Sequence, residues 1–195
     1  MADRAKAASK DSLEAFKVLA LDPIGGLATA FSSLGEARAL GAGIVFGVTF
    51  AVSLFIAACI SHFRPDGFGD FLKFIVCSII PFLAMAGACF VGRKAFRGEG
   101  SIAVDVFVAG ASLLPLAFAA LASSILGFVN VEVMAMLVTF ALVLNILMLF
   151  TGFVRIAHIS ERGATLTVPL VLLASIWFSK IIYASLLSSA MRYMF

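Results

Sequence analysis

The sequence predicts an all-α polytopic integral membrane protein with five transmembrane helices, and three observations lead to this fold class. Of its 195 residues, 63% are hydrophobic and 13% are charged, whereas a typical soluble domain has about 25% charged residues. The mean hydropathy is +1.13. Five stretches are long and apolar enough to cross a hydrocarbon core of about 30 Å as helices. This composition excludes a disordered chain, and so few charges could not cover the surface of a water-soluble domain.

The five predicted spans follow one another with short polar joints, and together they form one transmembrane domain over residues 41–192. The spans run over residues 41–63, 71–92, 102–128, 133–154 and 166–190. The joints are rich in residues that end or cap helices, and Ser101 is placed to cap the third span. Only a few residues separate the third span from the fourth, which predicts an antiparallel helical hairpin at that point.

The chain before the first span is predicted to form short amphipathic helices on the cytoplasmic side. We expect residues 1–8 to be a disordered, weakly basic tail and residues 9–40 to be the amphipathic segment. These helices can lie on the lipid surface, or they can pack on the bundle as a cap. A docking surface for a soluble partner is a third reading, and the sequence leaves all three open.

Two helices are expected within this amphipathic segment. Asp22 followed by Pro23 suits the start of the second helix. Apolar residues recur at helical spacing over residues 24–34, and Gly35 is placed to end the helix. The first span is then expected to begin near Gly41.

The basic residues predict the orientation in the membrane. Ten of them fall in the N-terminal segment and in the loops after the second and fourth spans, and three fall on the opposite side. Because basic loops stay in the cytoplasm, we expect a cytoplasmic N-terminus and an external C-terminus, in the cytoplasmic (inner) membrane of a bacterium. The net charge of +3 is then a topology signal, and no nucleic-acid partner is expected.

Three sequence elements carry a resemblance to a known family. They are Asp22-Pro23-Ile24-Gly25-Gly26, Gly98-Glu99-Gly100-Ser101 and the run Val108-Ala109-Gly110-Ala111-Ser112-Leu113-Leu114-Pro115. With five spans and a cytoplasmic N-terminus, the chain resembles the Yip-domain family of Ypt/Rab-interacting membrane proteins, and its bacterial branch in particular. The resemblance covers residues 12–190 and implies a five-span fold. Eukaryotic members are implicated in Rab GTPase binding, vesicle trafficking or membrane shaping, but this chain has almost no N-terminal cytoplasmic domain.

Asp105, Asn145 and Lys180 are the candidate functional polar residues inside the spans. Ionisable groups in a membrane are costly, and they often mark functional sites. Each of the three also has a structural reading. Asp105 can interact with the helix dipole or pair with a nearby basic residue, Asn145 can bond between helices, and Lys180 can extend towards the headgroups. Asp105 and Lys180 are not expected to pair, because their depths differ by about 15 Å.

Two prolines and two glycines are predicted to shape the bundle. Pro81 and Pro115 lie in the middle of the second and third spans, where each is expected to kink its helix. Such kinks can line a transport site or can simply shape the packing. Gly43 and Gly47 form a small-xxx-small element, which predicts close helix packing within the bundle or between copies.

The loop after the second span contains Arg93, Lys94 and Arg97, which are candidate contacts for a partner or for anionic lipids. Motifs of catalysis are missing from the sequence. It has no zinc-ligand spacing, no phosphate-binding loop and no nucleophile elbow. We therefore expect no catalytic residue, no metal and no cofactor, and the chain is predicted not to be an enzyme.

Two functional hypotheses remain open. The leading one is a non-enzymatic Yip-type membrane scaffold or adaptor that binds partners or shapes the membrane at the cytoplasmic face. Its expected partners are membrane lipids and either another protein or a second copy. The alternative is a small transporter, channel or lipid-moving protein with a polar path near the kinked second and third spans. That alternative predicts a cavity lined by at least two of Asp105, Asn145 and Lys180.

Overall fold

The computed structural model describes residues 2–60, 67–126 and 130–186, with side chains from Ser9 onward, and this part of the chain forms α-helices without any β-strand. The helices are α1 (Ala2–Leu21), α2 (Gly26–Ile60), α3 (Phe68–Ala95), α4 (Ile102–Leu126), α5 (Val131–Arg155) and α6 (Glu161–Leu186). Five of them, α2–α6, are long and apolar enough to cross a membrane. The predicted fold class is therefore confirmed. The predicted span ends at 61–63, 127–128 and 187–190 lie outside the described residues.

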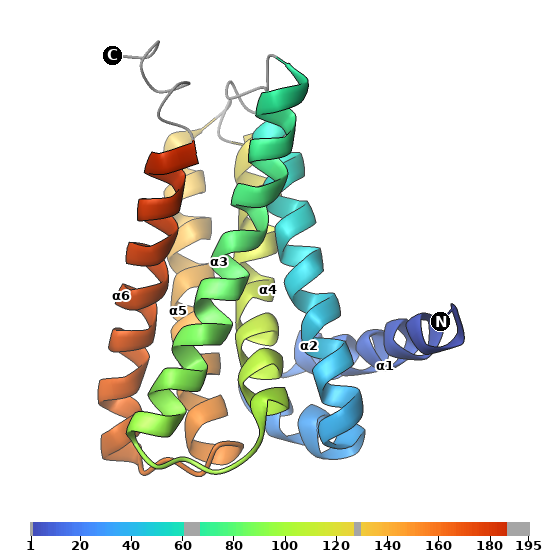
Figure 1. Cartoon of the computed structure of the whole chain (residues 1–195), viewed down its shortest axis with the longest axis vertical. Coiled ribbons are helices and arrows are strands. Elements are labelled where there is room, and N and C mark those ends of the chain that lie inside the picture. Colours follow the sequence, from blue (N-terminus) through green and yellow to red (C-terminus); the bar gives the residue numbers. More distant parts are fainter. Residues whose placement is uncertain (1, 61–66, 127–129, 187–195) are drawn as a thin grey trace.

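Helices α2–α6 stand side by side and run alternately up and down, whereas α1 lies across the bundle (Figure 1). The end at which α3 and α5 finish and α4 and α6 begin is called the lower end, and the opposite end is called the upper end. The helix starts follow from local capping. Ala103 N donates to Ser101 Oγ at 3.3 Å, as predicted, and Glu132 N donates to Asn130 Oδ1 at 2.9 Å.

Helix α4 occupies the centre of the bundle. In its most apolar stretch 72% of the residues are buried, against at most 33% in any other span. Its neighbours α2, α3 and α5 pack around it, and its many small residues let them approach closely. The outer faces of the other spans expose Val, Leu, Ile and Phe side chains. These faces suit contact with lipid.

Gly43 and Gly47 both face helices of the same bundle, but they face different ones. A Cβ atom on Gly43 would lie 2.6 Å from the Cα of Phe107, so α2 and α4 touch backbone to backbone at this point. Gly110 of α4 faces Gly43 from the other side of the contact, and Gly47 lies against the ring of Phe82 in α3. The sequence predicts that Gly43 and Gly47 pack either within the bundle or between two copies, and the structure shows packing within the bundle.

Gly35 interrupts α2, and here the predicted boundaries need correction. Its backbone angles of φ 70° and ψ 163° break the helix, so the predicted stop at Gly35 is confirmed. The helix resumes directly after Gly35, however, so the helix that contains the first span begins several residues before Gly41. The Arg38 side chain compensates for the break by donating to the carbonyl oxygens of Leu34 and Ser33 at 2.9 and 3.3 Å.

The structure also corrects the N-terminal segment. Residues 2–8 belong to α1, so the expected disordered tail is wrong, and their alanines are strong helix formers. After α1, Asp22 Oδ1 accepts a hydrogen bond from Gly25 N at 2.8 Å. This turn delays the start of α2 to Gly26, three residues beyond the predicted start at Pro23.

The C-terminal half of α1 packs on the bundle. Ala15 and Leu19 are buried, and the ring of Phe16 lies 6.0 Å from that of Phe118 in α4. In the same helix, Leu13 and Leu21 remain 56% and 90% exposed. The segment is therefore a cap on the bundle that also presents apolar side chains outward.

Candidate functional site

A buried ion pair joins the last turn of α3 to the first turn of α4. Arg93 Nε donates to Asp105 Oδ1 at 2.8 Å and Arg93 Nη2 donates to Asp105 Oδ2 at 2.7 Å. The third nitrogen, Nη1, donates to the carbonyl oxygen of Gly100 at 2.7 Å. The two side chains are only 2% and 1% exposed. Each charge thus has a bidentate partner, as a buried ion pair requires.

The short α3–α4 loop produces this geometry. Gly98 N donates back to the carbonyl oxygen of Arg93 at 2.8 Å, and Gly100 has a positive φ of 97°. Glu99 N donates to the carbonyl oxygen of Ala157 at 2.7 Å, which joins this loop to the α5–α6 loop. A cation at the end of α3 and an anion at the start of α4 also suit the two helix dipoles. These contacts tie α3, α4 and the α5–α6 loop together at the lower end, and in this sense we call the lower end closed.

This arrangement corrects one group of candidate residues. The sequence predicts that Arg93 contacts a partner or anionic lipid, but this residue is buried and is not available to either. The nearby Lys94 and Arg97 are exposed. Asp105 is held by Arg93 and does not line any of the cavities described below.

Asn145 joins α5 to α4 in the middle of the bundle. Its Nδ2 donates to the carbonyl oxygen of Ser112 at 2.8 Å, one turn before Pro115. The side chain is fully buried. Its Oδ1 has no hydrogen-bond partner within the described ranges. A buried acceptor without a donor costs about 1–3 kcal/mol, so this position suits a bound water molecule.

Tyr183 of α6 satisfies a backbone group that Pro81 leaves open in α3. Pro81 has no N–H, so the carbonyl four residues earlier, at Cys77, lacks its helical donor. The Tyr183 hydroxyl donates to the Cys77 carbonyl oxygen at 2.9 Å. Sequence reasoning missed this contact, although a proline within a span predicts that some side chain must bond to the carbonyl of residue i−4.

Tyr183→Phe is expected to destabilise the protein by about 1–3 kcal/mol, because it leaves the buried Cys77 carbonyl unpaired. In a Pro81→Ala background the helix supplies its own donor, and the same change should cost clearly less. Unfolding of the purified chain in mixed micelles measures all four corners of this double-mutant cycle. An equal cost in both backgrounds would disprove the compensation.

A cavity of about 570 Å³ lies among α2–α6, and we call it the central cavity. All five spans line it, and most of the lining is apolar. Its lining residues include Phe50, Pro81, Met85, Leu113, Leu116, Leu142, Asn145, Leu172, Ser175, Ile176, Ser179, Lys180, Tyr183 and Ala184. Two of the three predicted polar residues, Asn145 and Lys180, therefore share one cavity, and Asp105 does not.

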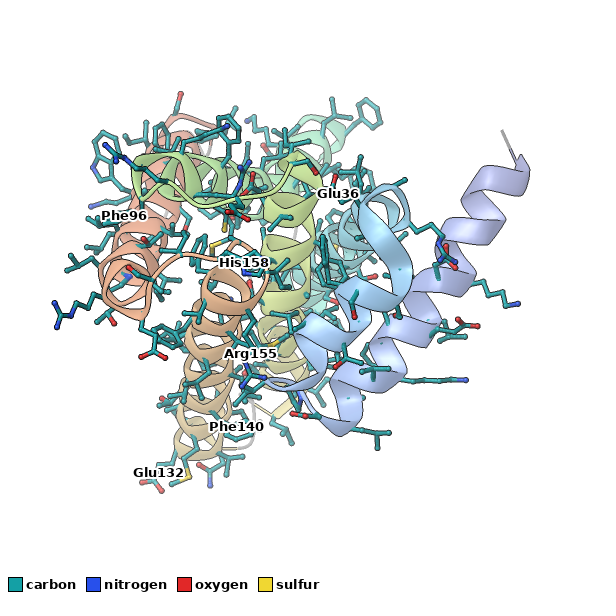
Figure 2. All side chains as sticks on the ribbon, turned by 90° about the horizontal axis from the view of Figure 1, so that it is seen from below. Glu36, Phe96, Glu132, Phe140, Arg155 and His158 are labelled. Carbon is teal, nitrogen blue, oxygen red and sulfur yellow. The ribbon has the colours of Figure 1, made fainter. Side chains whose placement is uncertain are left out.

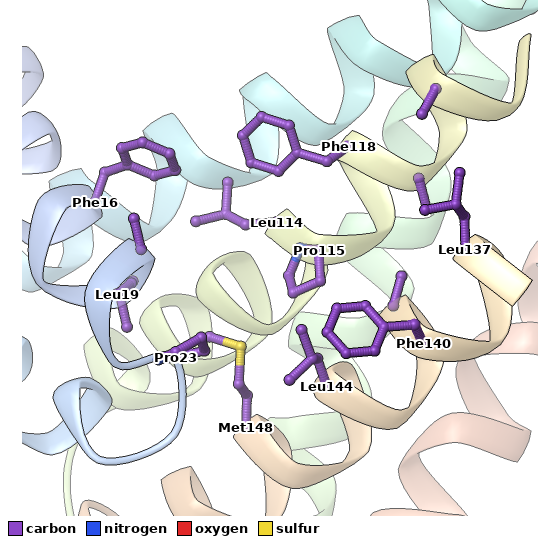
Figure 3. Close-up of a pocket in the computed structure, with 14 residues that line it drawn as sticks. Phe16, Leu19, Pro23, Leu114, Pro115, Phe118, Leu137, Phe140, Leu144 and Met148 are labelled. Carbon is purple, nitrogen blue, oxygen red and sulfur yellow. The ribbon is translucent and has the colours of Figure 1, made fainter. Parts of the chain in front are cut away.

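A second cavity, of about 320 Å³, lies between α1, α4 and α5, and we call it the α1 cavity. Figure 3 shows Phe16 and Leu19 of α1 facing Pro115 and Phe118 of α4, with Phe140, Leu144 and Met148 of α5 on the far side. All its lining side chains are apolar. It has no group that could orient a polar ligand.

The lower end also presents an exposed charged surface. Figure 2 shows this surface from below. Separate segments contribute to it, with Glu36 from α2, Phe96 from the α3–α4 loop, Arg155 from the end of α5 and His158 from the α5–α6 loop. Four basic side chains are exposed here, and we call them the basic face: Lys94, Arg97, Arg155 and Arg162. The carboxylates of Glu36, Glu99 and Glu161 are also exposed at this end. Within the described residues, none of the four takes part in an ion pair.

The fold and these sites define a five-span helical integral membrane protein with a closed lower end and a central cavity. In the part of the chain that the structure covers, no group of three or more His, Cys, Asp or Glu residues could hold a metal ion. Comparisons with protein-family models, with curated proteins and with solved structures find no match to this chain.

Proposed function

We propose that this chain is a non-enzymatic scaffold or adaptor of the Yip type, which binds partners or shapes the membrane at its lower end. The observation that carries this proposal is the combination of a closed lower end with a free basic face. The Arg93–Asp105 pair and the bond between Glu99 and Ala157 hold the two loops together. The exposed basic side chains are therefore displayed on a rigid support.

The positive charge of the basic face favours binding to an anionic partner. Lys94 and Arg97 lie at the junction of α3 with the α3–α4 loop, and Arg155 and Arg162 lie on either side of the α5–α6 loop. Because Arg93 is already neutralised by Asp105, these four residues supply the positive charge at this end, where they outnumber the exposed Glu36, Glu99 and Glu161. Anionic headgroups attract such clusters by about 1 kcal/mol for each basic residue. Membrane lipids and an acidic surface on a protein partner or second copy are both suitable occupants.

Helix α1 supports the same function. It lies across the bundle (Figure 1) and carries exposed Leu13 and Leu21 beside exposed Lys10 and Lys17. A helix with this composition suits the boundary between headgroups and acyl chains, where it can act on local membrane shape. The proposal places the lower end in the cytoplasm of a bacterium, since the basic residues gather there.

Reversing two charges of the basic face tests the proposal. Lys94→Glu with Arg97→Glu is expected to lower binding of nanodisc-embedded protein to anionic vesicles by at least about 30-fold, because each residue contributes about 1 kcal/mol. Cross-linking in native membranes should show the parallel loss of any partner that the lower end recruits. Vesicle co-flotation and quantitative mass spectrometry measure the two effects.

Lys73→Glu is the matched control, because Lys73 belongs to the upper end and pairs with Asp70 at 2.9 Å. This variant should retain both kinds of binding. If the double reversal leaves vesicle binding and cross-linked partners unchanged, the basic face is not the binding surface.

A second candidate function is a small transporter, channel or lipid-moving protein. The central cavity favours it, because Asn145 and Lys180 both line that cavity. Asp105 does not line that cavity and is buried against Arg93 at the lower end. This candidate therefore requires a polar path between the cavity and the lower end, whereas the scaffold function does not.

A further inference from the structure

The central cavity has a composition that selects one class of occupant. Its walls come mainly from apolar side chains, including Phe50, Met85 and Leu142. Its volume of about 570 Å³ lies in the range of ligand pockets, about 300–1,000 Å³, and is too small for a helix of another protein. Apolar walls of this size favour a flexible hydrocarbon chain over a polar solute.

One charged group distinguishes this cavity from the α1 cavity. Lys180 lines it and is exposed, about 9 Å before the described end of α6 at Leu186. No carboxylate pairs with Lys180 anywhere in the described ranges. An ionised side chain on a transmembrane helix is costly without a counter-ion. An anionic group at the mouth of the cavity would supply that counter-ion.

We propose that the central cavity binds an anionic lipid, with the negatively charged headgroup at Lys180 and one acyl chain along the apolar walls. From Lys180 down to Leu172 the cavity-lining face of α6 runs for about 12 Å, which accommodates part of one acyl chain. Ser179 and Tyr183 also line the cavity within one turn of Lys180, but their hydroxyls already donate to the carbonyl oxygens of Ser175 and Cys77. Lys180 is therefore the group that meets the headgroup.

This inference does not depend on the scaffold function, because it concerns different residues. The basic face lies at the lower end, whereas Lys180 lies in the upper half of α6. The variant Lys94→Glu with Arg97→Glu should therefore retain the lipid in the central cavity. The two proposals can fail separately.

Native mass spectrometry of the delipidated full-length protein tests the inference. Phosphatidylglycerol, oleate and phosphatidylcholine are added separately to the protein in detergent. We expect at least one of the two anionic lipids to bind about tenfold or more tighter than phosphatidylcholine. The phosphatidylglycerol and oleate arms show whether a phosphate or a carboxylate is the preferred headgroup. Equal binding of all three lipids would overturn the proposal.

Two variants test the position of the lipid. Lys180→Met should abolish the preference for anionic lipid, and Lys180→Arg should retain it. Ser175→Leu, which fills the cavity, should weaken anionic lipid binding by about tenfold. The matched control is Ala174→Leu, because Ala174 lines the separate groove between α3 and α6.

A preference for anionic lipid that survives Ser175→Leu would refute the cavity site, since Lys180 would then contact lipid only at the protein surface. A preference that survives Lys180→Met would equally refute the assignment of the headgroup. Circular dichroism and size-exclusion chromatography confirm that each variant is folded before its lipid affinity is compared.

Discussion

Arg93→Met is expected to destabilise the folded protein by about 3–5 kcal/mol, because it leaves the buried Asp105 carboxylate without its partner. The guanidinium also supplies the donor for the Gly100 carbonyl at 2.7 Å, so the loop at the lower end loses an anchor as well. Denaturant unfolding of the purified chain in mixed micelles measures the change in the free energy of unfolding.

The controls for this variant follow from the geometry. Lys94→Met, at the next residue, should change stability by less than about 0.5 kcal/mol, since Lys94 is exposed. The double variant Arg93→Met with Asp105→Leu should recover part of the loss, because no uncompensated charge remains. If Arg93→Met were as mild as Lys94→Met, the ion pair would not hold the lower end together.

Gly110→Ala is expected to cost about 3 kcal/mol or to prevent folding, because the added methyl group overlaps the backbone of Gly43. A side-chain rotation cannot relieve this overlap, since the atoms on the other side belong to the main chain of α2. The helices must separate, and the packing around the central helix is lost along the crossing. The yield of monodisperse protein and its unfolding midpoint measure the effect.

Gly87→Ala provides the matched control for a glycine inside a span. A Cβ atom on Gly87 would meet nothing within 4 Å, and Ala favours a helix over Gly by about 1 kcal/mol. This variant should therefore be neutral or slightly more stable. Similar losses for Gly110→Ala and Gly87→Ala would show that the close contact between α2 and α4 is not important for stability.

The sequence alone identifies the elements that depend on local chemistry. The apolar runs predict the five spans because a membrane helix needs a continuous apolar stretch, and the structure has five such helices. The stop at Gly35 and the cap at Ser101 also follow from single residues. The helix over residues 2–8 does not follow from hydrophobic periodicity, because this segment is polar and charged, and only the high helix propensity of its alanines indicates it.

The candidate site required more than local patterns. Asp105 had three nearby basic residues as possible partners, and only the path of the α3–α4 loop selects Arg93. The same choice leaves Lys94 and Arg97 exposed. Tyr183 and Cys77 are 106 residues apart in the chain, so their contact depends on which helices are neighbours.

The sequence by itself determined that five helices are long and apolar enough to cross a membrane, roughly where these five lie, and how few polar groups they contain. The tertiary structure decided which of those groups meet. Arg93 and Asp105 neutralise each other at the lower end, whereas Asn145 and Lys180 line one cavity. The physical reason is that helix formation in lipid depends on hydrophobicity along the chain. Which buried groups pair depends on how each helix is rotated about its axis and on which helices are its neighbours. A sequence that is apolar on all sides of a helix specifies neither of these.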